Sequence, residues 1–383
     1  MSRITVSISD QVIRWALERS SQGANLEKRF PNISDWISGS SQPTMHQLEA
    51  FARATSTPLG YFFLTKPPDE RLSIPHFRTI GYGGPQKPSA NLLETVQIME
   101  RRQAWMREHL VELGNEPLGF IRSARVSSEP VRLAYEIRRT LGFAEEWAAD
   151  QPRWTDALRL LINKMEEIGI LVVVNGIVGN NTHRKLDPIE FRGFVLADEY
   201  APLVFVNGAD GKAAQMFTLA HELAHLWFGS SAVFDLRELQ PADDETERAC
   251  NRLAAEFLVP ESKMRDFWPS VKQEPEPFQA IARHFKVSEL VAARRAIDLN
   301  LITKAEFLDF YREYQEKERH VSGAQEGGNF YATQNLRIGR RFAEAVVRAA
   351  RESRLLYRDA YQLTGLYGDT FEKYAQSLVG GAP

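Results

Sequence analysis

The chain of 383 residues contains a single cysteine, Cys250, which excludes a disulfide bond within the chain. It also lacks an apolar run long enough for a membrane span. The longest run, residues 169–179 (GILVVVNGIVG), is short and contains the polar Asn175. The start of the chain, MSRITVSISDQVIRW, has no apolar signal region. These absences predict a soluble, cytoplasmic protein without a membrane partner.

An excess of charge of either sign is missing as well. The 47 Lys and Arg residues nearly balance the 50 Asp and Glu residues, which leaves a net charge of −3. This balance gives no global attraction to nucleic acid, so any contact with DNA would have to be local. A hydrophobic content of 43% suffices for a full core, and the length predicts two or three domains.

The chain does contain the motif HELAH, residues 221–225, within the run GKAAQMFTLAHELAHLWFG. Residues 212–228 contain neither proline nor glycine, which predicts one long helix. Residues four apart share a helix face, so His221 and His225 can bind one metal ion while Glu222 points toward the same cavity. Chance produces such a motif in a chain of this length on the order of one time in a hundred. The motif predicts a zinc hydrolase site; the alternative is a core helix with two hydrogen-bonded histidines.

A catalytic zinc ion takes three protein ligands and a water, so this motif leaves one ligand to be found. The run DDETERACNRLAAEFLVP begins with acidic residues and ends at a proline, which is typical of a second helix. Glu247 lies on a face of this helix that is otherwise small and apolar, with Asn251 one turn further on as a candidate outer-shell residue. The rivals are Glu245, expected as a first-turn charge, and Glu256, expected in solvent. Helix phase favours Glu247.

These two stretches together resemble the ImmA/IrrE family of zinc metallopeptidases. The family signature is HExxH followed by E-x-x-[AC]-N-x-x-A-A-x-x-L-x-P, and this chain has HELAHLWFG and then ETERACNRLAAEFLVP. The upstream block GNNTHRKLDPIEFRGFVLADEYAPLVFVNGAD is also similar to the region before the metal helix in longer members. The resemblance implies that His221, His225 and Glu247 bind Zn²⁺ and that Glu222 is the catalytic base.

The resemblance also implies a fold and a substrate. The expected fold class is α+β and mainly helical, with a zincin-like domain whose small sheet lies beside the HExxH helix, flanked by N- and C-terminal helical domains. Family members cleave a cognate transcriptional repressor, often encoded on mobile elements or in stress-response loci. The zinc ion would make hydroxide available near neutral pH, and Glu222 would accept the proton and pass it to the leaving amine.

Two alternatives from other functional classes remain at this point. The chain could be a DNA-binding transcriptional regulator with a structural or sensory zinc ion, or an antitoxin-like protein that acts by binding alone. A complete ligand set accompanied by Glu222 argues against a structural zinc, because such a site has no use for that carboxylate. The oligomeric state is not determined by the sequence.

Two strand candidates, RGFVLAD and APLVFVNG, precede the HELAH helix and predict an antiparallel hairpin. In zincin folds the strand beside the metal helix follows the cleft, where its backbone can pair with an extended peptide. His183, Arg192 and Tyr200 are candidate donors to the oxyanion of the tetrahedral intermediate. A structural role for each of them is the alternative, because nothing in their spacing directs them to the metal.

The N-terminal stretches DQVIRWALERS, DWISGSSQPTMHQLEAFARATSTPLGYFFL and IPHFRT resemble the Xre-type helix-turn-helix domain that precedes the peptidase in many ImmA/IrrE proteins. One departure is clear. Only ANLEKRFPNIS lies between the first helix and Trp36, which is shorter than the usual two helices, and Pro31 interrupts it. No recognition helix with several base-facing side chains is evident. A helical docking or regulatory domain is therefore preferred over direct DNA binding.

Composition changes divide the chain into four predicted regions. Residues 1–85 form the Xre-like domain and its Gly/Pro-rich linker, and residues 86–150 a helical connection. The arginines of this connection, including Arg102, are balanced by glutamates and predict a solvated helix face. Residues 151–320 form the metallopeptidase domain, in which Arg294 and Arg295 are assigned to helix packing rather than to DNA. Residues 321–383 form a C-terminal helical domain, with the roles of lid, docking surface and stabilising cap all open.

Overall fold

The structure is a computed structural model that describes residues 5–20, 23–74, 88–234, 244–318 and 330–379. The chain folds into two compact units, one of residues 1–73 and 85–96 and the other of residues 74–84 and 97–383. Within the described residues, no helix has both the length and the apolar character that crossing a membrane requires. The division into four regions stays a prediction, and the two units are described in turn.

The first unit is a group of short helices around an aromatic core. Trp36 and Phe51 meet edge to face, and Phe62 packs against Phe51. Between the first helix and Trp36 lie one helix and the start of a second, which contains Trp36; the likeness of this unit to the Xre-type domain stays a prediction. Pro31 lies in the turn between two helices of seven and six residues. The elements of this unit are α1 Asp10–Arg19, α2 Gly23–Arg29, α3 Ile33–Ser38, α4 Met45–Ala54 and the 3₁₀ helix η1 Leu59–Phe63.

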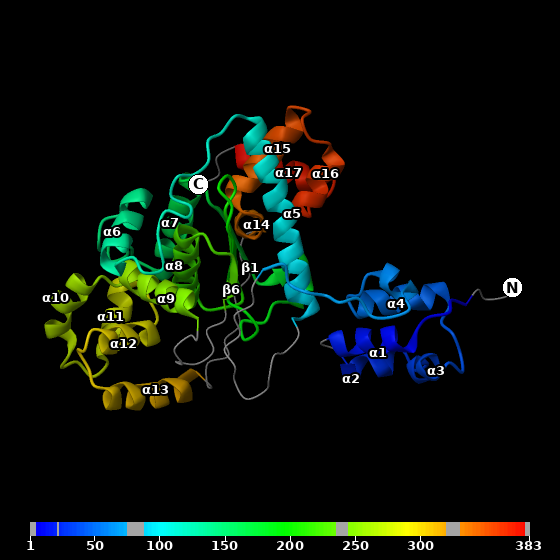
Figure 1. Ribbon diagram of the computed structural model, residues 1–383, viewed down its shortest axis with the longest axis horizontal. Helices are drawn as coiled ribbons and strands as arrows, with labels where there is room; N and C mark the ends of the chain where they lie inside the picture. Colours follow the sequence, from blue (N-terminus) through cyan, green and yellow to red (C-terminus); the bar gives the residue numbers. More distant parts are fainter. Residues whose placement is uncertain (1–4, 21–22, 75–87, 235–243, 319–329, 380–383) are drawn as a thin grey trace. The chain divides into compact units, whose positions relative to one another are not determined.

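A four-stranded mixed sheet forms the centre of the second unit (Figure 1). Its strand order is β1-β5-β4-β6; β1 pairs with β5 in parallel, and the other two pairs are antiparallel. The β4–β5 pair is the predicted hairpin, with Phe194 opposite Phe205. The strands are β1 Leu171–Asn175, β4 Gly193–Leu196, β5 Leu203–Asn207 and β6 Ala232–Phe234, with β2 Ile177–Val178 and β3 Asn181–Lys185 in a separate pair. The predicted class, mainly helical with a small sheet, is confirmed.

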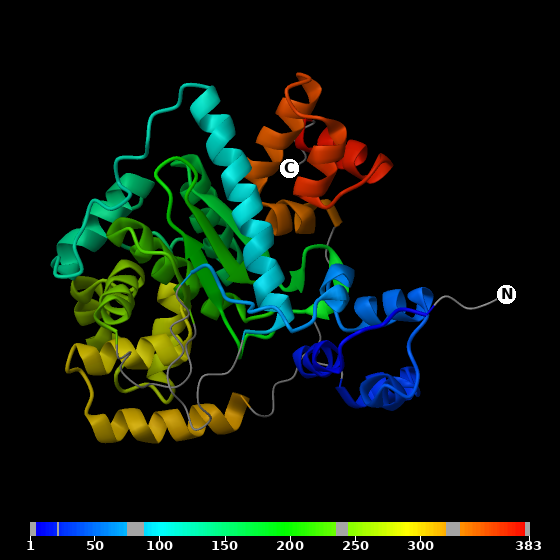
Figure 2. The same cartoon turned by 45° about the vertical axis from the view of Figure 1, so that its right-hand side comes forward.

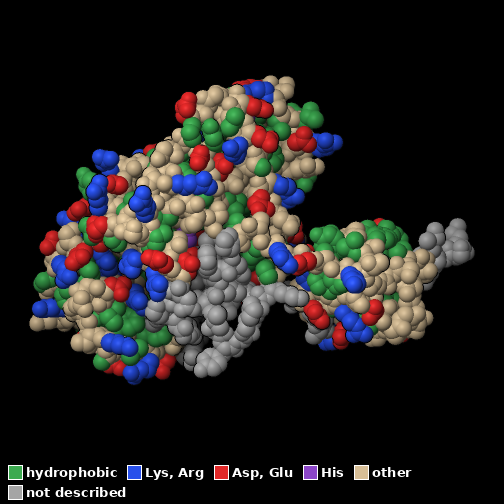
Figure 3. All heavy atoms as spheres, in the orientation of Figure 1, with side chains coloured by type: hydrophobic (Ala, Val, Ile, Leu, Met, Phe, Trp, Pro, Cys, Tyr) green, Lys and Arg blue, Asp and Glu red, His purple; other side chains and the backbone are tan. Residues whose placement is uncertain are grey.

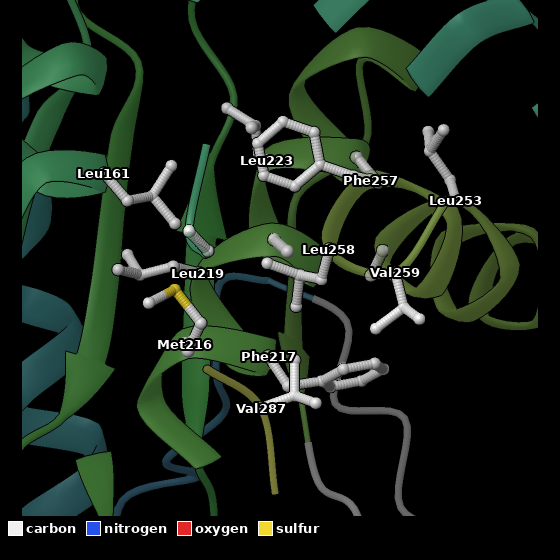
Figure 4. Close-up of a cluster of buried hydrophobic side chains, with 14 of the residues drawn as sticks. Leu161, Met216, Phe217, Leu219, Leu223, Leu253, Phe257, Leu258, Val259 and Val287 are labelled. Atoms are coloured by element: carbon white, nitrogen blue, oxygen red, sulfur yellow. The ribbon is translucent and has the colours of Figure 1, made fainter. Parts of the chain in front are cut away.

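The helices that carry the predicted site pack directly on this sheet and on each other. α8 (Lys212–Phe228) lies against β4 and β5, and α9 (Glu245–Leu258) lies against α8 and against α6 (Pro130–Leu141). Figure 4 shows the apolar cluster where α8 and α9 meet α7 (Trp154–Glu167). It includes Leu161, Met216, Phe217, Leu219, Leu223, Leu253, Phe257, Leu258, Val259 and Val287. Burial of these side chains fixes α8 and α9 against each other, which sets the distance between residues on their facing sides.

A buried ion pair joins α9 to the helices that follow it. Glu256 is only 3% exposed and pairs with Arg295, so the expectation of a solvated Glu256 was wrong. Arg295 also donates to the carbonyl of Val259, which confirms its assignment to packing. Arg138 of α6 donates to the carbonyls of Glu256 and Phe257. The helices after α9 are α10 Glu261–Val271, α11 Pro277–Phe285, α12 Glu289–Asp298 and α13 Lys304–Glu318.

The C-terminal helices cover the edge of β1 and pack beside α5 (Ala90–Glu112), whose part after residue 96 belongs to this unit (Figure 2). Arg102 of α5 is buried and donates to the carbonyls of Arg337 and Leu363, so the expected solvated face was wrong at this position. Gly339 has φ 86°, and a Cβ there would lie 2.8 Å from the carbonyl oxygen of Val172. The C-terminal helices are α14 Phe330–Ile338, α15 Arg340–Arg351, α16 Tyr357–Thr364 and α17 Asp369–Val379.

The carboxyl of Glu166, on α7, contacts the C-terminal helix α15 and gives a stability prediction. Burial raises the pKa of Glu166 from 4.5 to about 7, although it accepts a hydrogen bond from the backbone N–H of Arg341. The folded state therefore holds a proton that the unfolded chain releases, and this contribution to stability is lost as the pH rises from about 4.5 to 7. The Glu166→Gln side chain stays neutral. Its free energy of unfolding at pH 8 should therefore be about 2–3 kcal/mol higher than that of wild type.

Chemical denaturation of wild type and Glu166→Gln at pH 5 and pH 8 checks this expectation. The two proteins should be close in stability at pH 5 and differ at pH 8. Glu167→Gln is the matched control, because the neighbouring Glu167 side chain is 60% exposed and pairs with Lys164. Parallel stability curves for wild type and Glu166→Gln across this pH range would contradict the prediction.

Candidate metal centre

His221 and His225 lie one helical turn apart on α8 and are fully buried. Their Nε2 atoms are 3.1 Å apart, so both rings point at one place. Burial lowers the pKa of His221, and the hydrogen bond and charge of Glu247 only partly oppose this effect. Burial therefore favours the neutral imidazole, which is the form that binds a metal.

Glu247 comes to the same place from the first turn of α9. The Asp244 carboxylate caps this helix by accepting hydrogen bonds from the N–H groups of Thr246 and Glu247, which fixes the turn that carries Glu247. One carboxylate oxygen of Glu247 lies 3.1 Å from the Nε2 of His221, and the other lies 3.1 Å from the Nε2 of His225. Burial alone would raise the pKa of Glu247, but the contacts with the two histidines outweigh burial and hold it well below the usual range.

Each histidine also has a partner on its outer nitrogen. The Nδ1 of His221 lies 3.1 Å from the Oδ1 of Asn251, and the Nδ1 of His225 lies 2.8 Å from the Oγ of Ser230. When Nδ1 carries the proton and donates it to these oxygens, both Nε2 atoms keep a free lone pair. The structure thus brings Asn251 into the outer position that the sequence predicts for it. Ser230 was not predicted, and its only sequence signal is that it follows the glycine that ends the HELAH helix.

Glu222 is fully buried beside these residues, and neither of its carboxylate oxygens has a hydrogen-bond partner among the residues that the structure describes. Burial and the negative charge of Glu247 raise the pKa of Glu222 well above its usual value. Gly193 of β4 leaves the space that this side chain occupies. A Cβ at Gly193 would lie 2.5 Å from the Cγ2 of Thr218 and 3.3 Å from Oε1 of Glu222. Close packing of β4 on α8 therefore requires glycine at this position.

The three donor groups fit one divalent cation. Two ligands at 2.0–2.1 Å from a tetrahedral zinc ion lie about 3.3 Å from each other, close to the spacing of the two Nε2 atoms and the Glu247 oxygens. Within the described residues, both oxygens of the buried Glu222 are without a hydrogen bond. Burying such polar groups is costly unless something compensates them. Two imidazole nitrogens and a carboxylate form a donor set typical of zinc.

A second donor set competes with this one. Cys250 is also buried, and its sulfur and one ring nitrogen each of His221 and His225 all lie within 4.8 Å of one another. The Glu247 oxygens lie 3.1 Å from the two imidazole nitrogens, close to the separation of two ligands on a tetrahedral zinc ion. Burial also raises the pKa of the Cys250 thiol well above its usual value, so a metal ion would have to displace the thiol proton on binding. The two direct contacts with the histidines favour Glu247 as the third ligand, with Cys250 as the alternative.

The three candidate oxyanion donors make their contacts elsewhere. His183 is exposed on β3, Arg192 pairs with Asp210 at 3.2 Å, and the ring of Tyr200 lies under the guanidinium of Arg107. None of these interactions reaches the His221–Glu247 cluster. A role for them in stabilising an oxyanion stays a prediction.

The structure gives no sign of a nucleic-acid patch on the face shown in Figure 3, where Lys and Arg side chains are interspersed with Asp and Glu. In the first unit, the six-residue helix α3 exposes Ser34, Asp35 and Ser38, none of which is cationic. Lys and Arg side chains supply the electrostatic part of DNA binding, and α3 exposes none of them. Whether the N-terminal unit binds DNA stays a prediction.

A buried cluster of two histidines and a glutamate on paired helices beside a small mixed sheet is the arrangement of a metallopeptidase domain. Residues 165–296 match the family described as the IrrE N-terminal-like domain, a peptidase family, and this range holds every residue of the cluster. Residues 165–296 therefore form a domain of the ImmA/IrrE family, and this domain supports a function of the metallopeptidase type. Residues 338–377 match a family described only as a domain of unknown function. No curated protein is significantly similar to the chain.

Proposed function

We propose that this protein is a zinc-dependent endopeptidase whose metal is held by His221, His225 and Glu247. The observation that carries the proposal is the convergence of two imidazole nitrogens and a carboxylate, each 3.1 Å from the next. Beside them, the buried carboxyl of Glu222 makes no hydrogen bond to any described residue. A structural zinc site has no use for the carboxyl of Glu222, so this residue supports a catalytic role.

Glu222 is the proton carrier of the proposed reaction. Zinc, when bound, polarises the scissile carbonyl and lowers the pKa of water, which makes a nucleophile available near neutral pH. Glu222 accepts the proton from the attacking water and then gives it to the nitrogen of the leaving amine. Burial and the charge of Glu247 raise the pKa of Glu222 above its usual value, which is the direction in which enzymes shift a carboxyl for proton transfer.

The proposed substrate is a cognate transcriptional repressor, in a stress-response, mobile-element or toxin-antitoxin setting. The family relationship of residues 165–296 supports this substrate class. The sheet supports a polypeptide substrate in general, because β6 is the last strand of the described sheet on the side away from β1. An extended peptide can pair with the backbone of such an edge.

A comparison of new protein N-termini tests the proposal. Cells that express wild type or Glu222→Gln at matched levels are compared under a stress such as DNA damage. We expect one or a few cleavages that occur only with wild type, at least one of them in a DNA-binding repressor. Selective cleavages in other proteins would reject the repressor while keeping the peptidase. No wild-type-specific cleavage, together with a stable complex between the inactive protein and a partner, would favour function by binding alone.

A further inference from the structure

We propose that Ser230 is a positioning residue that holds His225 in the tautomer able to bind the metal, an inference that rests on the proposed zinc site. The Oγ of Ser230 lies 2.8 Å from the Nδ1 of His225, on the side of the ring opposite the His221 and Glu247 contacts. For Nε2 to offer a lone pair, Nδ1 must carry the proton, and the Ser230 oxygen accepts it.

The backbone fixes Ser230 at this position by ending α8 directly after the motif. Gly229 adopts φ 73°, in the left-handed region, and its N–H bonds back to the helix. The N–H of Ser230 donates to the carbonyl of His225 at 3.0 Å. Ser230 is thus bound to His225 through both its backbone and its side chain, so the hydroxyl has little freedom to leave the ring.

A second segment of the chain holds this turn from outside. The N–H groups of Arg122 and Ala124 donate to the carbonyls of Leu226 and Trp227, the last turn of α8. Arg122 itself has φ 60°, which is rare for a residue with a side chain. Its side chain fills the space beside Gly229, where a Cβ would lie 1.9 Å from the Cγ of Arg122. Glycine is therefore required at position 229 for conformation and for space.

The neighbouring Ser231 has a different hydrogen-bond partner and provides a matched control. Its Oγ accepts a hydrogen bond from the N–H of Ala197 at 2.9 Å, which links the turn to the end of β4. Ser230 and Ser231 are both partly buried and have the same side chain. Of these two serines, Ser230 is the one whose hydroxyl contacts a predicted metal ligand. A general loss of packing or of a hydroxyl should affect the two variants alike, whereas loss of the histidine partner should affect Ser230→Ala alone.

Zinc affinity measured by chelator competition tests the assignment. We expect Ser230→Ala to bind zinc about 10–100-fold more weakly than wild type, the usual cost of losing the partner of a metal-bound histidine. Ser231→Ala should stay within about threefold, and Ser230→Thr, which keeps the hydroxyl, should recover most of the affinity. The Nδ1–H resonance of His225 in the zinc-loaded protein should be sharp in wild type and lost to solvent exchange in Ser230→Ala.

The outcomes distinguish a failure of the role assigned to Ser230 from a failure of the proposed zinc site. Wild-type affinity and an unchanged His225 resonance in Ser230→Ala would overturn the role of Ser230 and leave the zinc site intact. Equal losses in Ser230→Ala and Ser231→Ala would assign both serines to the stability of the turn and would also overturn it. Failure of wild type itself to bind zinc would reject the proposed function before Ser230 is considered.

Discussion

Replacing Glu222 with Gln should abolish peptide hydrolysis while leaving both the fold and the metal content intact. Gln has nearly the same shape as Glu but cannot accept the proton of an attacking water. Loss of a general acid–base group typically reduces turnover about 100- to 10,000-fold. Because neither oxygen of Glu222 has a hydrogen-bond partner within the described residues, the exchange removes no native hydrogen bond of this side chain.

The same exchange should not destabilise the protein without metal. The pKa of Glu222 is raised well above its usual value by burial and by the charge of Glu247, so the ionised carboxylate is costly in the folded state. A neutral amide avoids this cost at any pH at which Glu222 would ionise. We therefore expect the thermal midpoint of metal-free Glu222→Gln to equal or exceed that of wild type above neutral pH.

Three measurements check this prediction: turnover of a peptide that spans the cleavage site found in cells, zinc content after dialysis, and thermal unfolding. Glu245→Gln is the matched control, since Glu245 is exposed in the first turn of α9 and should not affect turnover. Turnover by Glu222→Gln at the rate of wild type would reject Glu222 as the proton carrier. Loss of both turnover and zinc would instead make this residue part of the metal's support.

The elements that carry the candidate site could be predicted because their signals are local. The absence of proline and glycine between residues 212 and 228, followed by Gly229, defines α8, and four-residue spacing places His221 and His225 on one face. Acidic residues followed by an apolar stripe define α9 in the same way. The alternation of two strand candidates with a short turn predicts the β4–β5 hairpin.

The buried charges could not be predicted because their partners are distant in sequence. Arg102 donates to backbone carbonyls 235 and 261 residues further along the chain, and Glu256 pairs with Arg295, 39 residues away. In a helical pattern, such residues look the same as solvated ones. Charge balance along one helix was therefore a poor guide, since the partner that permits burial lies on another element.

Zinc binding should distinguish the two candidates for the third ligand. Glu247→Ala should lose zinc, and Cys250→Ala should keep it. Both residues lie on α9 and both are buried, so they are matched in position. The Glu247 carboxylate lies 3.1 Å from the Nε2 of each histidine. Loss of an outer-shell partner costs about 10–100-fold in metal affinity, so loss of a ligand should cost more than about 100-fold. Cys250→Ala should stay within about threefold of wild type, because no ligand is removed.

Chelator competition on the three proteins distinguishes the two donor sets, with thermal unfolding of the metal-free forms as the control for folding. Charge gives a further reason to expect Glu247. Glu247 and Glu222 are buried close enough for the charge of Glu247 to raise the pKa of Glu222, and a divalent cation between the two imidazoles and Glu247 would compensate this repulsion. If Cys250→Ala lost zinc and Glu247→Ala retained it, the donor set would be two histidines and a cysteine, and Glu247 would become a neighbour of the ion instead of its ligand.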